Sequence, residues 1–339
     1  MGTWVFDGQP EHSVTPLEAF NAQRSTLNAQ LIFEPGLTYS RDKNAAGIQK
    51  AVAKARQADV ILFFCGEEAI LSGEARCRAD LNLPGAQAEM MEALAKTGKP
   101  VVMIVMAGRP LTIGKQVEQA AAVLYAFHGG TMAGPALVNL LTGKVVPSGK
   151  TPVTFPKMVG QIPLYYNRHN TGRPSYDPPM LIDSIPIGCP QFSIGQSSYW
   201  LETPTEPLFP FGFGLSYTTF EYGKPQLTSL NTQSSFNISC EITNTGNLDA
   251  YEVAQLYTHQ LSGDLVRPLK ELKGFEKVFI PAGESRTVTF TLTKEQLGYW
   301  HEEKQDCNSR VWFATDDADF ELWIAPDSRC QTAAVPFRF

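Results

Sequence analysis

The chain has few of the residues on which metal and redox centres depend. Its six cysteines in 339 residues include no Cys-x-x-Cys pair, which argues against a zinc or thioredoxin-type site. Its five histidines show no metal-ligand spacing, so we expect each to have a packing or surface role. The turn at Gly129-Gly130 lacks the dinucleotide-binding fingerprint. We therefore expect neither a metal nor any other cofactor.

Basic charge and long apolar runs are also scarce. The 28 lysines and arginines are outnumbered by 34 acidic residues, for a net charge of −6, whereas proteins that bind nucleic acid carry clustered basic residues. No apolar run approaches the roughly 20 residues that span a bilayer. The first residues show no basic and apolar leader. We expect no nucleic-acid partner and no membrane segment, and the compartment stays open.

The chain does contain enough apolar residues to form packed cores. The hydrophobic share is 43% and the charged share 18%, and the length suggests two domains. In the first half, helical and strand patterns alternate, which predicts an α/β fold with a doubly wound, mostly parallel sheet. No strand pattern precedes the first helix, so we expect the leading strand of this sheet to lie in another piece. The expected helices are 15–25, opened by a capping box at Thr15 to Glu18, 48–55, 87–96 and 132–141, and the expected strands are 31–33, 60–64, 101–106 and 123–126.

The second half has a different pattern. Residues 158–222 are rich in proline, glycine and aromatics, which indicates an irregular wrapping or linking segment. From residue 223, apolar residues alternate with polar ones, as at 236–242 and 288–292, with turn signals between. This pattern predicts an all-β sandwich of the immunoglobulin or fibronectin type III kind. The predicted domains are 1–157, 158–222 and 223–339.

The stretch from Cys65 to Pro84 is the clearest candidate for a functional site. An apolar run that reads as a buried parallel strand ends at Gly66, and three carboxylates follow: Glu67, Glu68 and Glu74. In open α/β sheets the functional crevice lies beyond the carboxyl ends of the strands. These carboxylates are therefore expected to face a ligand.

This stretch resembles the acid/base loop of glycoside hydrolase family 3, the β-glucosidase family, in which Gly-Glu precedes a second Glu and a Leu-x-Leu stretch. Further blocks follow in the family's order over essentially the whole chain, and the last of them places the final sandwich as the family's fibronectin type III-like domain. They include Gly108-Arg109-Pro110, Pro147-Ser148-Gly149-Lys150, Phe211-Gly212-Phe213-Gly214 and Arg267-Pro268-Leu269-Lys270-Glu271-Leu272.

The resemblance implies a retaining β-glucosidase that acts on terminal β-glucosides or oligosaccharides. Such an enzyme needs two carboxyl groups, and in this family the nucleophilic Asp lies on a (β/α)8 barrel that precedes this region. No such barrel fits before residue 60. We therefore expect this chain to be the C-terminal part of a larger enzyme, inactive alone, with the barrel as its partner and a homodimer left open. The alternatives are a β-xylosidase and a non-catalytic carbohydrate-binding or interaction module.

The same resemblance points to particular residues. Glu74 is the expected general acid/base. Glu67, closer to the strand end, is the rival, although a structural role such as holding Arg78 fits it better. Arg78 is expected to hold the loop in shape through a carboxylate. Tyr199 and Trp200 could stack on a sugar ring or cement a domain interface.

Overall fold

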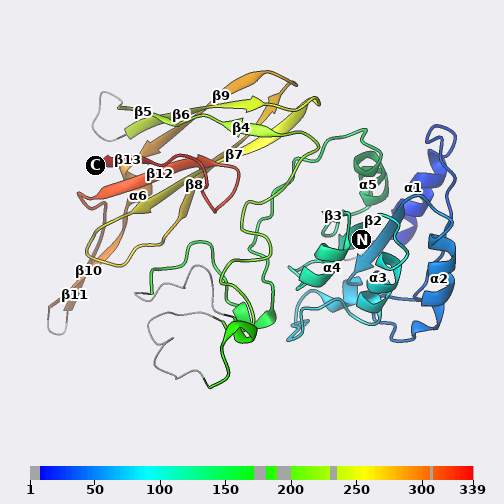
Figure 1. Cartoon of the computed structure of the whole chain (residues 1–339). Helices are drawn as coiled ribbons and strands as arrows, with labels where there is room; N and C mark the ends of the chain where they lie inside the picture. The colour runs from blue at the N-terminus through cyan, green and yellow to red at the C-terminus, as the bar shows by residue number, and fades with distance from the viewer. Residues whose placement is uncertain (1–7, 172–180, 189–199, 230–234, 306–307, 339) are drawn as a thin grey trace. The chain divides into compact units, whose positions relative to one another are not determined.

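The computed structural model describes residues 8–171, 181–188, 200–229, 235–305 and 308–338. The chain divides into two compact units (Figure 1). Unit 1 comprises residues 1–145 and 155–162, and unit 2 comprises residues 146–154 and 163–339. The helices and strands of the alternating pattern thus lie in unit 1, and the strand-rich second half lies in unit 2.

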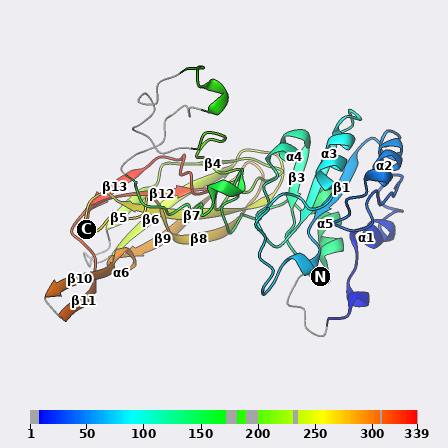
Figure 2. The ribbon, with the colours of Figure 1, turned by 90° about the horizontal axis from the view of Figure 1, so that it is seen from below.

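Unit 1 is built on a parallel sheet in the order β1-β2-β3. Helices α1 and α5 lie on one side of it and α2, α3 and α4 on the other (Figure 2). On the first side, Phe20 and Val138 form a buried cluster against Leu62 and Phe64 of β1. The predicted doubly wound α/β fold is confirmed. The elements are β1 (Ile61–Gly66), β2 (Val101–Met106), β3 (Ala122–Tyr125), α1 (Pro16–Ala22), α2 (Ile48–Ala55), α3 (Gln87–Ala95), α4 (Gly114–Gln119) and α5 (Ala133–Leu141), with 3-10 turns η1 (Pro10–His12), η2 (Ala45–Gly47), η3 (Ala69–Leu71) and η4 (Val159–Gln161).

The sequence predicted the start of helix α1 better than its end. The capping box is present: the Glu18 backbone N–H donates to Thr15 Oγ1 at 3.2 Å, and the Thr15 N–H donates to the Glu18 carboxylate at 2.7 Å. The helix ends at Ala22, however, three residues before the predicted end. Helix α4 was not predicted, since its six residues carry no capping signal.

The predicted strand at residues 31–33 is wrong. Those residues have no regular structure, and Ile32 and Phe33 are exposed. A strand is stabilised by the ladder to its neighbour, and within the described residues β1 pairs only with β2. A short apolar run without a partner strand therefore stays irregular.

Unit 2 contains a β-sandwich, as predicted. One sheet has the order β13-β12-β7-β8, and in the other β6 pairs with β4, β5 and β9. Ile238 and Val288 from one sheet pack on Leu256 and Phe320 from the other, each at most 1% exposed. Strands β10 and β11 form a separate two-stranded ribbon. The elements are β4 (Phe220–Tyr222), β5 (Gln226–Ser229), β6 (Ser235–Asn244), β7 (Ala250–Gln260), β8 (Glu271–Ile280), β9 (Ser285–Thr293), β10 (Tyr299–Gln305), β11 (Asn308–Ala314), β12 (Asp319–Ala325), β13 (Val335–Arg338), α6 (Lys294–Leu297) and the 3-10 turn η5 (Ile182–Ser184).

A buried ion pair fixes the segment 146–154 within unit 2. Lys150 Nζ lies 2.8 Å from a carboxylate oxygen of Glu252 and donates to the Gly214 carbonyl at 3.0 Å. The Tyr222 hydroxyl donates to the same Glu252 oxygen at 3.1 Å. Burial, together with the Glu252 carboxylate, raises the pKa of Tyr222, so the phenol keeps its proton at neutral pH. The lysine of the Pro-Ser-Gly-Lys block therefore has a packing role.

We expect Lys150→Met to lower the free energy of unfolding by about 3–5 kcal/mol, because it leaves the Glu252 charge buried without its cation. Equilibrium urea unfolding followed by far-ultraviolet circular dichroism would measure the loss. The double variant Lys150→Met, Glu252→Gln, which removes the buried charge as well, should recover part of it. A single variant within about 0.5 kcal/mol of the parent, the range of ordinary surface changes, would show that the pair does not stabilise the unit.

Candidate functional site

The three parallel strands of unit 1 end at the same edge of the sheet, and Glu67 is the first residue beyond β1. Its backbone N–H donates to the Met106 carbonyl at the end of β2, at 2.9 Å. Gly66 has a φ of +129°, and a Cβ there would lie 2.1 Å from the same carbonyl oxygen. Only glycine fits so close an approach. The sheet edge thus sets where the loop begins.

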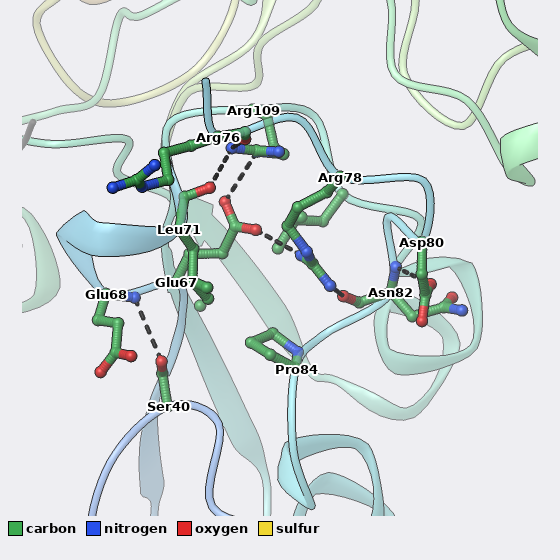
Figure 3. Close-up of polar contacts among 12 residues, drawn as sticks. Ser40, Glu67, Glu68, Leu71, Arg76, Arg78, Asp80, Asn82, Pro84 and Arg109 are labelled. Atoms are coloured by element: carbon green, nitrogen blue, oxygen red, sulfur yellow. Dashed lines mark hydrogen bonds and ion pairs between the residues drawn. The ribbon is translucent and has the colours of Figure 1, made fainter. Parts of the chain in front are cut away.

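The Glu67 carboxylate lies between two guanidinium groups (Figure 3). Its side chain has 0% exposure, and those of Arg78 and Arg109 have 17% and 18%. Arg78 Nη1 donates to Oε1, and Arg109 Nε lies 3.1 Å from Oε2 as an ion pair without hydrogen-bond geometry. Burial of a lone carboxylate is strongly unfavourable, so the two cations are what allow it.

Each arginine also contacts backbone carbonyls of the loop. Arg78 Nη2 donates to the Asn82 carbonyl at 3.1 Å. Arg109 Nη2 donates to the carbonyls of Leu71 and Arg76, the latter at 3.1 Å (Figure 3). Through these two arginines, the buried Glu67 carboxylate is linked to the backbone carbonyls of three loop residues. Arg109 was noted in the sequence only as part of a family motif, because nothing local indicates that its side chain reaches residues 71 and 76.

Gln87, the first residue of α3, joins the two ends of the loop and was missed by the sequence reasoning. It is 4% exposed. Its Oε1 accepts from the Gly66 N–H at 2.7 Å, and its Nε2 donates to the carbonyls of Gly66 and Pro84 at 2.8 and 3.1 Å and to that of Ser40 at 2.7 Å. A glutamine in the first turn of a helix carries no distinctive sequence signal, so only the structure shows this contact.

Glu74 lies in the exposed part of the same loop. Its neighbours Gly73 and Ala75 have φ values of +112° and +56°, and the Arg76 N–H donates to the Gly73 carbonyl at 3.2 Å, which closes a turn around Glu74. A positive φ at alanine is uncommon and costs free energy. The Glu74 carboxylate makes no hydrogen bond or ion pair with the residues that the structure describes. It is therefore free for a ligand.

A cavity of about 300 Å³ lies on the other side of Glu67, between β1 and residues 35–40. Tyr39, Glu68 and Met90 are among its lining residues. Glu68 is already paired with Arg41, and its N–H donates to Ser40 Oγ at 3.3 Å. Glu68 therefore holds the segment around Ser40 and Arg41.

The sequence also singled out two aromatic residues, Tyr199 and Trp200. Tyr199 is not among the described residues, and Trp200 is half-buried in an irregular part of unit 2. The sugar-stacking expectation for both residues stays a prediction.

Within the described part of the chain, one group of side chains could hold a metal ion: Asp264, His301 and Asp316, whose ligand atoms lie within 4.8 Å of one another. The His301 ring stacks between Tyr299 and Trp312, and Nε2 lies 3.3 Å from the Ala314 carbonyl. These contacts explain its burial by packing. No helix of the described ranges has the length and apolar character to cross a membrane.

Comparison with known proteins agrees with the fold. The profile of the glycosyl hydrolase family 3 C-terminal domain matches residues 1–217, and that of a fibronectin type III-like domain matches residues 252–328. These matches define the class, a hydrolase region of α/β type followed by a β-sandwich. The chain belongs to glycosyl hydrolase family 3, as the motifs indicated.

Individual relatives are similar over most of this chain. A periplasmic β-glucosidase of Salmonella typhimurium is 34% identical over 97% of the chain, which covers 43% of that protein. A β-xylosidase of Formosa agariphila is 38% identical over 76% of the chain and 33% of its own length. The crystal structure of a β-glucosidase from Listeria innocua in complex with glucose matches 99% of the chain and 43% of its own, with a TM-score of 0.84 and 29% identity. The chain thus spans less than half the length of these relatives.

Replacement of Gln87 by the similarly sized methionine should lower the free energy of unfolding by about 2–4 kcal/mol, because buried groups at both ends of the loop lose their partner. Chemical denaturation would measure the change. Gln57→Met is the matched control: Gln57 is exposed on the protein surface, and its loss should cost at most about 0.5 kcal/mol. Equal effects of the two substitutions would contradict the role given to Gln87.

Proposed function

We infer that this chain is the part of a retaining β-glucosidase that supplies the general acid/base, Glu74. The observation that carries this proposal is the state of its carboxylate: exposed and unpaired among the described residues, on a loop fixed at both ends beyond the carboxyl edge of a parallel sheet. Ligand sites of open α/β sheets lie at that edge. The names of the relatives support the same reaction class.

Glu74 would act twice in each cycle. It first donates its proton to the glycosidic oxygen as the leaving group departs, and then, as a carboxylate, it takes a proton from the water that attacks the covalent glycosyl-enzyme. A group with this role needs a raised pKa, which desolvation by a bound substrate can supply because it disfavours the charged form. The exposed position of Glu74 leaves room for such a substrate.

Glu67 is the weaker candidate for the same role. Its two oxygens face separate arginines, so neither oxygen is available to a substrate. With 0% exposure, its side chain is also closed to substrate. We therefore assign Glu67 and Arg78 to holding the loop.

The nucleophile would come from outside this chain. The relatives named above are more than twice as long as the region they share with it, which leaves room for the (β/α)8 barrel and its Asp. We propose no activity for the chain alone. Because relatives named for glucosides and for xylosides both match, a β-xylosidase is the second candidate, and the two sugars are to be compared directly.

In a protein where a family 3 barrel precedes this chain, Glu74→Gln should lower kcat for an alkyl β-glucoside by about 10²–10⁴-fold, the usual contribution of a general acid/base. Azide, which attacks the glycosyl-enzyme without base assistance, should restore turnover of an aryl β-glucoside whose leaving group needs no protonation and give the β-glycosyl azide. Steady-state rates and product analysis measure both, with the matching xylosides assayed in parallel.

Glu89→Gln is the control, since it removes one exposed carboxylate from α3 and should leave kcat within about twofold, as expected of a surface change. Unchanged activity in Glu74→Gln would refute the assignment of the acid/base. Oligosaccharide binding by this chain without a barrel would then favour the non-catalytic binding module.

A further inference from the structure

Arg109 contacts the loop from outside it, at two backbone carbonyls and at Glu67. It follows β2, and its guanidinium lies between the buried Glu67 carboxylate and the carbonyls of Leu71 and Arg76. We propose that Arg109 is a positioning residue for Glu74: it holds residues 71–76 in the conformation that aims the Glu74 carboxyl at the glycosidic oxygen. This inference rests on the proposed acid/base role of Glu74.

The two carbonyls bracket Glu74 along the chain. Only four residues separate Leu71 from Arg76, so fixing both carbonyls on one guanidinium closes the segment into a small ring that contains Glu74. Inside it, the Arg76 N–H donates to the Gly73 carbonyl at 3.2 Å. Because the Glu74 carboxylate makes no hydrogen bond or ion pair with a described residue, the conformation of this backbone is what fixes the point from which its side chain extends.

The segment 71–76 also packs closely on the residues that follow β2. A Cβ placed on Gly108 would lie 2.8 Å from Ser72 Oγ and 3.1 Å from His128 Nε2. Glycine at this position therefore lets Ser72 approach the residue just before Arg109. The contact brings the loop within reach of the guanidinium.

Arg109 is itself held from β3. The Tyr125 hydroxyl donates to the Arg109 carbonyl and accepts from the Leu111 N–H at 3.3 Å. The Tyr125 ring packs edge-on against Phe155, with 4.7 Å between centroids. Burial raises the pKa of Tyr125, so its hydroxyl remains a donor at neutral pH. Tyr125 of β3 thus holds Arg109, and Arg109 holds the loop that carries Glu74.

Arg78 provides a matched comparison. It pairs with the same carboxylate, but its second contact is the Asn82 carbonyl, well beyond the bracketed segment. A lysine at either position keeps the positive charge near Glu67 but lacks the planar fork that contacts a carboxylate and carbonyls together. Arg109→Lys and Arg78→Lys therefore differ chiefly in which part of the loop they release.

The first test compares leaving groups in the barrel-containing protein. An alkyl β-glucoside needs proton donation from the acid, whereas a 2,4-dinitrophenyl β-glucoside departs without it. For Arg109→Lys we expect kcat/KM on the alkyl substrate to fall about 10²-fold, as for a misplaced catalytic group, with a much smaller loss of kcat/KM on the dinitrophenyl substrate. The comparison uses kcat/KM because it reports formation of the glycosyl-enzyme alone, whereas hydrolysis of that intermediate needs Glu74 with either substrate. Arg78→Lys should lower kcat/KM on the two substrates by similar factors. If Arg109 had a merely structural effect, Arg109→Lys would also lower kcat/KM on the two substrates equally, and that result would overturn the proposal.

The second test uses the 339-residue chain and needs no activity. Hydrogen exchange at the amides of Leu71, Ser72 and Arg76, which all donate to loop carbonyls, should be faster in Arg109→Lys than in Arg78→Lys. Equal exchange in the two variants would overturn the proposal. If Glu74→Gln is inactive but Arg109→Lys shows no leaving-group dependence, only the positioning role fails. If Glu74→Gln is fully active, the acid/base assignment fails and the positioning role with it.

Discussion

The loop after β1 depends on one constraint, the burial of the Glu67 charge. A carboxylate with no solvent contact is tolerable only beside compensating cations, and here each oxygen faces a different arginine. One of these arginines comes from the loop and the other from the segment after β2. The charge is therefore neutralised only when both segments are in place, which makes the loop conformation and the sheet edge depend on each other.

The same loop carries two carboxylates with opposite environments. Glu67 is buried and paired, while Glu74 is exposed and makes no hydrogen bond or ion pair with described residues. A group that exchanges protons with a substrate has to be reachable, whereas a group that holds backbone in place can be fully buried. Under the proposed assignment, one loop serves both purposes, with Glu67 and Glu74 seven positions apart.

The blocks that carried the family resemblance contact one another or the loop. In unit 2, Lys150 of one block donates to the carbonyl of Gly214 in another, and the Thr151 N–H donates to the Phe213 carbonyl at 2.7 Å. In unit 1, Arg109 of the Gly-Arg-Pro block pairs with Glu67. Buried polar side chains need hydrogen-bond partners. In these blocks the partners are residues of another block or of the loop, distant in sequence.

Local patterns were sufficient for most of the elements of the α/β unit. The apolar runs at β1, β2 and β3, the capping box of Thr15 and the alternation in the sandwich predicted strands and helices because each pattern depends on near neighbours along the chain. The same patterns placed Glu67 and Glu74 beyond the end of a buried strand. Tertiary structure alone decided that residues 31–33 form no strand, that Gln87 joins the loop ends and that Arg109 reaches residues 71 and 76. Those outcomes depend on which groups meet in space across tens of residues, and no local pattern encodes such a meeting.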